Sequence, residues 1–402
     1  MTTTLTSHGA LAGLRVIDLS RVLGGPYCAQ YLADHGADVI KIEPPQGDET
    51  RYWGPFKDGK SAYFSGINRN KRNAAIDFSK PEGRELLLTL LEDADVLLHN
   101  FKSGTLERWG IGYDEVLSQR FPRLIYCHIT GFGDDGPLGG LPGYDAVIQA
   151  MSGIMSVTGT AEGGPTRLGV PVVDIGSGLH AVAAILMAVI ERERSGLGQK
   201  LDVALYDCAL PFLHPHASGY LQTGAVPVRT GNEHPTIAPY EQFDTATGPM
   251  FLGVGNDGQF AKACALLDCR ELLEDERFKT NAERVRNRRA LHDLLQPVLL
   301  QHDAAKLAVH LIEEGVPAGA ILDVPAVLAA PHTKHRKMIA DLPGDEAIGI
   351  PVKLSRTPGS VRTAPGVFGE RTREVCREAG LTDDQIDALI EQGVLHVAKD
   401  AR

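Results

Sequence analysis

The chain has 402 residues, 43% of them hydrophobic, and its 51 acidic residues against 40 basic ones give a formal net charge of −11. This length has room for two or three domains, and the acidic balance predicts no general nucleic-acid surface. No unbroken apolar run approaches the ~20 residues of a membrane span. The polar start, residues 1–9, lacks the features of a secretory or organelle presequence, so we expect a cytoplasmic protein. The six cysteines form no CxxC pair, which is typical of reduced thiols.

Short β-branched segments alternate with helix-forming segments in the N-terminal half of the chain. The expected strands are residues 15–19, 37–43, 73–78, 95–100, 123–130, 171–174 and 200–206. The expected helices are 25–36, 81–92, 179–194 and 208–223, with Ser195–Gly198 as a helix C-cap. Buried strands that alternate with helices predict an α/β fold with a parallel sheet covered on both faces.

The composition changes at residues 224–240, which are rich in Pro, Gly, Asn and His and mark a boundary or a functional loop. A hairpin around Gly248-Pro249 and further helices are expected up to about residue 331. Residues 351–362 look extended, and 382–392 predict a short final helix with Thr382 as its N-cap.

The first glycine loop, residues 20–26, follows the first strand, and Glu43 ends the second. This order suggests a dinucleotide site, but the GxGxxG fingerprint is missing and Pro26 fits the first turn of a helix. An ordinary tight turn is the simpler interpretation. A nucleotide-like ligand held elsewhere at the strand carboxyl ends would still suit such a sheet.

An amide, an aromatic ring and a cation follow the strand that ends at residue 100. Asn100 can hydrogen-bond a base, Phe101 can stack on it, and Arg108 can bind phosphate in a bidentate manner. The alternative is a solvated loop with Phe101 turned into the core and Lys102 in water.

Asp174 stands between a buried strand and a Gly-Ser-Gly helix start. Free backbone N–H groups and a positive helix end would keep this carboxylate ionised and lower its pKa. A carboxylate so placed can act as a nucleophile, and the N–H groups can stabilise an oxyanion. The alternative is a plain N-cap aspartate. His214 and His216 have a metal-like spacing without a carboxylate or thiol nearby in sequence, so we predict no metal site.

Several segments together resemble the class III CoA-transferases, the family of formyl-CoA transferase and carnitine CoA-transferase. The matching segments, in order, are residues 11–43, 47–51, 68–72, 100–104, 143–146, 196–199 and 369–370. The resemblance implies that Asp174 is the catalytic aspartate and that CoA or acyl-CoA binds as a substrate, with no permanently bound cofactor. It places in the CoA site Arg21, Leu23, Gly24, Ile76, Asn100, Phe101, Lys102, Arg108, Tyr144 and Asp145.

The same resemblance implies a mechanism and an architecture. Asp174 would attack an acyl-CoA thioester to form a mixed anhydride, and the released CoA thiolate would then form an aspartyl-CoA thioester. A Rossmann-like large domain would be built from residues 1–224 and 331–402, with a smaller α+β domain at 225–330. Two chains would form an interlocked homodimer.

The chain departs from the family pattern at two positions and lacks one loop. Pro44 stands where some members have Arg, and Arg371 stands where the family usually has His. The long glycine loop of formyl-CoA transferase has no clear equivalent, which argues against oxalate. Residues 231–240 resemble instead the subgroup that acts on succinate, hydroxymethylglutarate and related dicarboxylates.

Three other functions compete with CoA transfer. A 2-methylacyl-CoA racemase shares the fold but needs a histidine where this chain has Tyr144, whose ordinary pKa of about 10 suits a neutral-pH base poorly. A non-catalytic CoA-binding protein is disfavoured by Asp174 beside Gly176 and Gly178. A nucleotide-dependent oxidoreductase is disfavoured by the missing fingerprint.

Overall fold

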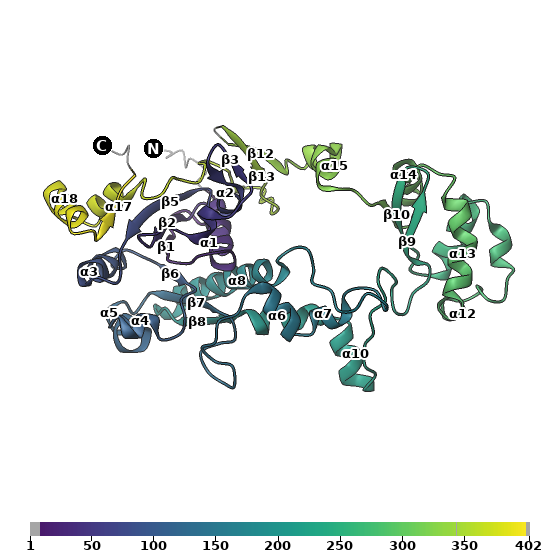
Figure 1. Ribbon diagram of the computed structural model, residues 1–402, viewed down its shortest axis with the longest axis horizontal. Coiled ribbons are helices and arrows are strands. Elements are labelled where there is room, and N and C mark those ends of the chain that lie inside the picture. Colours follow the sequence, from purple (N-terminus) through teal and green to yellow (C-terminus); the bar gives the residue numbers. More distant parts are fainter. Residues whose placement is uncertain (1–8, 343, 399–402) are drawn as a thin grey trace. The chain divides into compact units, whose positions relative to one another are not determined.

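A computed structural model describes residues 9–342 and 344–398 and divides the chain into two compact units (Figure 1). The first unit contains the chain up to Gly153, Gly169–His214 and the chain from Pro331 onward. The second contains Ile154–Leu168 and Pro215–Ala330. The sequence predicts a smaller domain at residues 225–330.

A seven-stranded sheet forms the centre of the first unit, in the order β14-β5-β2-β1-β6-β7-β8. These strands are β1 (Arg15–Asp18), β2 (Asp38–Glu43), β5 (Lys71–Ile76), β6 (Val96–His99), β7 (Ile125–Thr130), β8 (Lys200–Ala204) and β14 (Leu395–His396). All neighbours pair in parallel except β14, which runs antiparallel to β5 at one edge. Without β14, the order is the 3-2-1-4-5-6 of the Rossmann fold. The expected α/β fold with a parallel sheet is confirmed.

Helices from both ends of the chain complete the core of this unit. The long helices near the sheet are α1 (Gly24–Asp34), α3 (Pro81–Leu90) and α8 (Val172–Ser195). The C-terminal helices α17 (Thr372–Glu378) and α18 (Asp383–Glu391) add Val375 and Ile386 to a cluster that includes Ile17 of β1 and Leu87 of α3. A capping box at Thr382 starts α18 and confirms the predicted N-cap.

The remaining elements of the first unit are short. They are η1 (Glu49–Tyr52), β3 (Phe56–Lys57), β4 (Lys60–Ser61), α2 (Ala62–Gly66), α4 (Thr105–Arg108), η2 (Tyr113–Leu117), α5 (Ser118–Arg120), α6 (Asp145–Met151), α9 (Leu205–Ala209), η3 (Leu210–Leu213), α16 (Pro331–His335), β12 (Ile339–Leu342) and β13 (Asp345–Ile348). Residues 351–362 contain no helix or strand.

Two predicted elements are wrong. Residues 171–174 are not a strand, because α8 already begins at Val172 and Asp174 lies in its first turn. The Asp145 carboxylate accepts hydrogen bonds from the N–H groups of Val173 (2.8 Å) and Asp174 (3.2 Å), and this tertiary cap overrides the β propensity of the valines. The predicted helix 208–223 is broken near Pro211 and Pro215, because proline cannot continue a helical hydrogen-bond pattern.

Glycine allows α1 and α8 to approach each other closely. A Cβ atom on Gly178 would lie 2.7 Å from the carbonyl oxygen of Gly24. At the other end of α8, Gly196 has φ +79° and forms the predicted C-cap. By length and composition alone α8 could cross a membrane. A helix packed on a sheet passes the same test, so this feature is weak support for a membrane span.

The second unit has a three-stranded antiparallel sheet, β9 (Tyr240–Thr245), β10 (Gly248–Gly253) and β11 (Ala318–Ala320). The predicted hairpin at Gly248-Pro249 joins β9 and β10. Its helices are α7 (Ile154–Val157), α10 (His216–Thr223), α11 (Asp257–Leu266), η4 (Arg270–Leu273), α12 (Asn281–Arg286), α13 (Arg288–Leu299), α14 (Ala304–Glu313) and α15 (Val324–Ala329). Phe243, Phe278 and Leu311 lie in its own apolar core.

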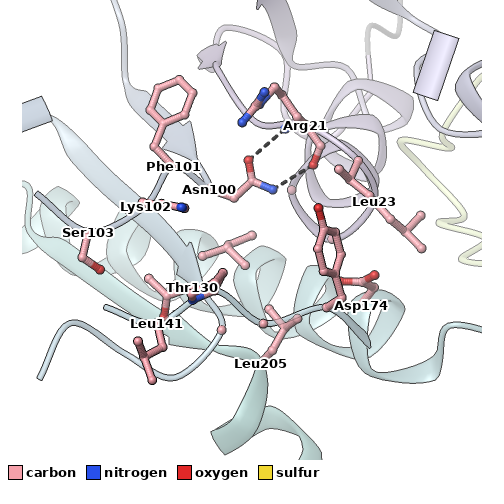
Figure 2. Close-up of a pocket in the computed structure, with 18 of the residues that line it drawn as sticks. Arg21, Leu23, Asn100, Phe101, Lys102, Ser103, Thr130, Leu141, Asp174 and Leu205 are labelled. Carbon is pink, nitrogen blue, oxygen red and sulfur yellow. Dashed lines mark hydrogen bonds between the residues drawn. The ribbon is translucent and has the colours of Figure 1, made fainter. Parts of the chain in front are cut away.

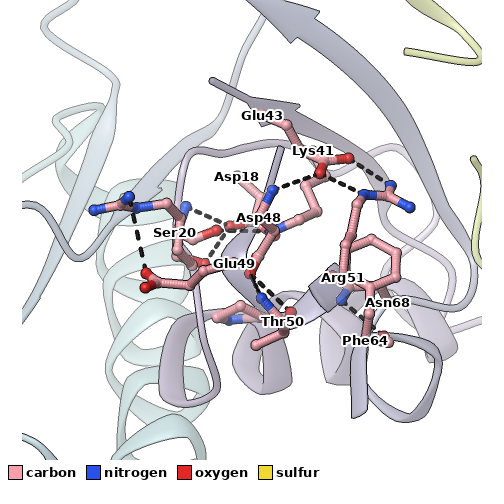
Figure 3. A network of polar contacts seen from close by, with 12 residues as sticks. Asp18, Ser20, Lys41, Glu43, Asp48, Glu49, Thr50, Arg51, Phe64 and Asn68 are labelled. Atoms are coloured by element: carbon pink, nitrogen blue, oxygen red, sulfur yellow. Dashed lines mark hydrogen bonds and ion pairs between the residues drawn. The ribbon is translucent and has the colours of Figure 1, made fainter. Parts of the chain in front are cut away.

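Fully buried charged side chains lie at the carboxyl end of β1, within β2, at the start of β5 and at Asp48; Figure 3 shows Asp18, Lys41 and Asp48. The Lys41 ammonium donates to the Asp48 carboxylate at 2.9 Å and to the Ser20 carbonyl at 2.8 Å. The Lys71 ammonium donates to Asp18 at 3.0 Å and to the Pro26 carbonyl at 2.8 Å. We call these four charged residues the lysine network. It balances two positive charges against two negative ones inside the protein, as buried charges require.

The environment shifts the pKa values within the lysine network. Burial alone would raise the pKa of Asp48, but the Lys41 charge and the Thr50 N–H outweigh it and hold the pKa below 3.8. Burial lowers the pKa of Lys71 to about 8 against the opposing effect of Asp18. The stabilisation from Asp48 is therefore present above its ordinary pKa and is lost as pH falls through the lower folded value.

We expect Asp48→Asn to lower the free energy of unfolding by about 3–5 kcal/mol, because it leaves the buried Lys41 ammonium without its counter-charge. Urea unfolding at pH 7 measures this change. Asp345→Asn is the matched control, since it breaks the exposed Lys57–Asp345 pair, whose N–O distance is 3.0 Å, and such surface pairs contribute little. Equal stability of the two variants would contradict a structural role for the lysine network.

Candidate active site

A pocket opens at the carboxyl ends of β1, β6 and β7 (Figure 2). Its lining residues are Arg21, Val22, Leu23, Gly24, Gly25, Glu49, Asn100, Phe101, Lys102, Ser103, Ile129, Thr130, Gly131, Gly140, Leu141, Pro142, Gly143, Tyr144, Asp174 and Leu205. The strand order reverses between β1 and β6, and open α/β sheets bind ligands at this switch point. The pocket therefore lies where the topology favours a ligand.

The first glycine loop forms one wall of the pocket and is held from several sides. The Asn100 side chain accepts from the Arg21 N–H at 2.9 Å and donates to the Arg21 carbonyl at 2.8 Å (Figure 2). The lysine network holds the carbonyls of Ser20 and Pro26 at the two ends of the loop. Val22 has φ +69°, a strained conformation for a β-branched residue, and these contacts maintain it.

The Asn100 amide is engaged by the protein's own backbone. Both ends of the amide contact the backbone of Arg21, so the side chain shapes the pocket wall. The Arg21 guanidinium lies 3.9 Å from Glu49, and its buried Nε has no hydrogen-bond partner among the residues that the structure describes.

Asp174 lies against the N-terminus of α1. A Cβ atom on Gly24 would lie 3.3 Å from the Asp174 carbonyl oxygen and 3.6 Å from its Oδ1. Gly176 is equally constrained, because a Cβ atom there would lie 2.3 Å from the Phe212 ring. The first N–H groups of a helix have no partner within the helix, and the N-cap residue of α1, Leu23, supplies no side-chain hydrogen bond. The start of α1 is therefore the better candidate for an anion-stabilising group.

The predicted electrostatics of Asp174 are wrong. Burial raises the pKa of Asp174 to about 7, and the nearby Asp145 charge adds to the increase. The N–H groups expected to lower this pKa donate to Asp145, which caps α8 in place of Asp174. The sequence could not show this, because Asp145 precedes Asp174 by 29 residues that contain α6, α7 and a loop.

The structure brings most of the predicted site residues together. Eight of them line the pocket: Arg21, Leu23, Gly24, Asn100, Phe101, Lys102, Tyr144 and Asp174. Ile76 lines an adjoining, more apolar pocket with Pro44, Phe78 and Trp109, and both pockets include Arg21, Phe101 and Lys102. Arg108 and Asp145 line neither pocket. Arg108 is exposed on α4, and Asp145 is buried under the start of α8.

Sequence reasoning missed several lining residues, among them Glu49, Ser103, Thr130, Leu141 and Leu205. Glu49 and Ser103 lie in segments that the family resemblance already marked. The others are ordinary residues in the sequence and reach the pocket only through the fold. Over residues 9–342 and 344–398, no cluster of three or more potential metal ligands occurs. All six cysteines are free and buried.

We expect Asp174→Asn to be more stable than the wild type at pH 8, by on the order of 2 kcal/mol. The folded-state pKa of Asp174 is raised, so ionising the carboxylate destabilises the native state as pH rises from about 4 through 7. Calorimetric melting at pH 8 and pH 5 measures the difference, which should shrink at pH 5. Asp207→Asn, at an exposed position on α9, is the control. A difference that is independent of pH would contradict the raised pKa.

Comparison with known proteins identifies the family. The sequence model of CoA-transferase family III matches residues 11–372. The succinate–glutarate CoA-transferase of Agrobacterium fabrum is 41% identical over 92% of this chain and 95% of its own. The acetyl-CoA:oxalate CoA-transferase of Acetobacter aceti is 40% identical over 88% of this chain and 91% of its own.

A solved structure supports the same assignment. A CAIB/BAIF family protein from Brucella suis superposes with a TM-score of 0.85 and is 43% identical, over 92% of this chain and all of the other. The likeness of fold and the family match over most of the chain support the same family. The chain belongs to CoA-transferase family III and is a CoA-transferase.

Proposed function

We propose that this enzyme moves CoA from an acyl-CoA donor to a carboxylic acid acceptor, with Asp174 as the covalent nucleophile. The observation that supports it most is the position of the Asp174 carboxylate, in a pocket at the sheet's switch point and against the start of α1. Partial burial raises the pKa of this carboxylate to about 7. A desolvated, more basic carboxylate is a better nucleophile than one in water.

The reaction is a sequence of acyl exchanges that conserves atoms and charge. An Asp174 oxygen attacks the donor carbonyl carbon, the C–S bond breaks, and CoA leaves as a thiolate. The thiolate attacks the Asp174 carboxyl carbon of the mixed anhydride and releases the first acid as a carboxylate. The acceptor carboxylate then attacks the carbonyl carbon of the aspartyl-CoA thioester, the C–S bond breaks, and a second mixed anhydride forms as CoA leaves as a thiolate. The thiolate attacks the acceptor's acyl carbon, the anhydride C–O bond breaks, and the new acyl-CoA and the Asp174 carboxylate are released.

The helix α1 would stabilise the oxyanions that form in these steps. Each attack places negative charge on an oxygen of the acyl group or of Asp174 itself, beside Gly24. Helix N-termini favour negative charge, and fixed N–H donors aimed at an oxyanion accelerate acyl transfer. The resident negative charge of Asp145 opposes ionisation of Asp174 and so raises its basicity.

The CoA moiety would extend from Asp174 across both pockets. Arg21 and Lys102 lie in the wall that the pockets share, and their charges suit the phosphates despite the net charge of −11. Leu23, Gly24 and Tyr144 border the pocket near Asp174, and Ile76 with Trp109 offers apolar surface for the adenine. Arg108 is exposed on α4, outside the residues that line the pockets, and would contact a CoA phosphate from the solvent side. Asp145 would act through α8 without touching CoA.

We propose dicarboxylates such as succinate or a glutarate derivative as the exchanged acids. The resemblance of residues 231–240 and the name of the Agrobacterium relative favour them. The Acetobacter relative makes oxalate the competing acceptor. No cofactor is required in this scheme, because the aspartyl thioester retains the energy of the thioester bond. We place the reaction in the cytoplasm.

Trapping the intermediate tests the reaction. Incubation with succinyl-CoA followed by hydroxylamine is expected to convert Asp174 to a hydroxamate, seen by peptide mass spectrometry. Asp174→Ala should give no modified peptide. Its turnover should fall by a factor on the order of 10³ or more, since the reaction loses its nucleophile. Exchange of the α-proton of a 2-methylacyl-CoA with solvent, without any adduct, would instead support the racemase. CoA binding without either reaction would support a binding protein.

The acceptor is tested separately. Acyl-CoA formation from succinyl-CoA with glutarate, hydroxymethylglutarate or oxalate, each at equal concentration, is followed by chromatography. We expect the five- and six-carbon acids to react faster than oxalate, and the reverse order would overturn the proposed subgroup.

We propose further that the active enzyme is the interlocked homodimer implied by the family resemblance. Leu179, Met187 and Ile190 form an apolar stripe along α8, with exposed fractions of 42%, 64% and 58%. Their spacing of eight and three residues places them on one face of the helix. Such a face is usually covered by another protein.

Light scattering after size exclusion should give twice the chain mass of 43.2 kDa. Met187→Glu is expected to shift the protein toward the monomer, because it places a charge in the apolar stripe. Ile312→Glu, at an exposed position on α14, is the matched control and should leave the mass unchanged. A wild-type protein of single-chain mass would refute the dimer.

A further inference from the structure

Two histidines support the pocket wall from behind without lining the pocket. His99 at the end of β6 and His128 in β7 are buried, and their rings stack with centroids 4.3 Å apart. They are register partners in adjacent parallel strands, which places them on the same face of the sheet. Neither ring is among the residues that line the two pockets.

Both histidines bond to the backbone of Phe101. His128 Nε2 lies 2.9 Å from the Phe101 carbonyl oxygen, so it donates to that oxygen. The Phe101 N–H points to His99 Nδ1 at 3.4 Å. Burial lowers the pKa of His99 well below 6.5, and the neighbouring His128 adds to this effect, so the His99 ring is neutral and its Nδ1 can accept. The two polar backbone groups of Phe101 are thus satisfied by imidazoles.

Asp134 extends this support to the other end of the segment. It accepts from the Ser103 hydroxyl at 2.6 Å and from the Lys200 ammonium at 2.8 Å, and it lies 3.3 Å from His128 Nδ1. Burial alone would raise the pKa of Asp134, but these contacts lower it to about 2, so Asp134 is ionised. Residues 101 and 103 are therefore both held, and Lys102 stands between them.

We propose that His128, together with Asp134, is a positioning residue that holds the segment Phe101–Ser103 in the geometry that receives acyl-CoA. The proposal rests on the proposed function for its substrate. His128 acts through the backbone of Phe101 and does not touch the reacting atoms. Preorganisation of this kind raises affinity by reducing the ordering that binding would otherwise require.

Two substitutions at residue 128 separate the contacts. The glutamine amide nitrogen reaches roughly as far as the imidazole Nε2, and the asparagine amide nitrogen reaches as far as Nδ1. His128→Gln keeps a donor for the Phe101 carbonyl, and His128→Asn keeps only the contact toward Asp134. We expect the asparagine variant to raise KM for acyl-CoA about tenfold with kcat little changed, the effect of one lost hydrogen bond. The glutamine variant should restore KM to near the wild-type value.

Trp109 reports the position of the segment without any ligand. Its indole packs edge-on against the Phe101 ring at 5.6 Å. The chain has two tryptophans, so a Trp53→Phe background makes Trp109 the sole indole emitter. In that background, His128→Asn should change the emission of Trp109 and its quenching by acrylamide, and His128→Gln should not.

The outcomes distinguish the two proposals. Equal kinetics and emission in both variants and the wild type would overturn the positioning role. Equal losses in both variants, together with a lower melting temperature, would also overturn it, because they indicate simple packing. If the wild type neither binds CoA nor forms the Asp174 adduct, the proposed function fails. The Trp109 emission of the two variants then still decides whether His128 positions the segment.

Discussion

The architecture of the site depends on buried charge. Lys41 and Lys71 place two ammonium groups inside the first unit, and each donates both to a carboxylate and to a carbonyl of the first glycine loop. Without these donors, the carbonyls of Ser20 and Pro26 would lose partners that water cannot easily replace in the interior. The lysine network therefore holds the first glycine loop in one conformation, because its ammonium groups bind both the carboxylates and the loop carbonyls. Because the loop leads into α1, it also fixes the helix end that faces Asp174.

The same protein uses the opposite electrostatic arrangement at Asp174. The carboxylates of the lysine network have lysine partners and lowered pKa values, whereas Asp174 is shielded from water and lies near a second acid. The ionised form of a structural carboxylate is stabilised by its partners. A nucleophilic carboxylate is more reactive when its ionised form is not stabilised in this way. The first glycine loop separates the two environments. The stability that the lysine network contributes thus offsets the destabilising effect of the buried Asp174 carboxylate in the pocket.

The sequence predicts the α/β fold and the parallel sheet, and eight of its eleven candidate site residues line the pocket, because these follow from local periodicity and from ordered family motifs. Two prolines interrupt the helix expected at 208–223, and the other errors concern contacts between distant residues. The valines at 172–173 have β propensity, but the Asp145 carboxylate places them in a helix. Because the N–H groups at the start of α8 donate to Asp145, they do not lower the pKa of Asp174 as expected. The sequence also does not reveal that Asn100 holds the Arg21 backbone across the switch point.

The contacts of Asp145 and Asn100 share a physical cause, which also bears on the proposed site. A side chain near a parallel sheet's switch point can bond to backbone from either half of the fold, and sequence spacing gives no sign of which group it will meet. Asp145, Asn100 and His128 each hold the backbone of a segment that borders the pocket. The groups that meet substrate can then be few and sterically simple, because their positions are fixed by neighbours that never touch it. On this argument, the specificity of acyl transfer depends as much on the residues behind the pocket wall as on those that line it.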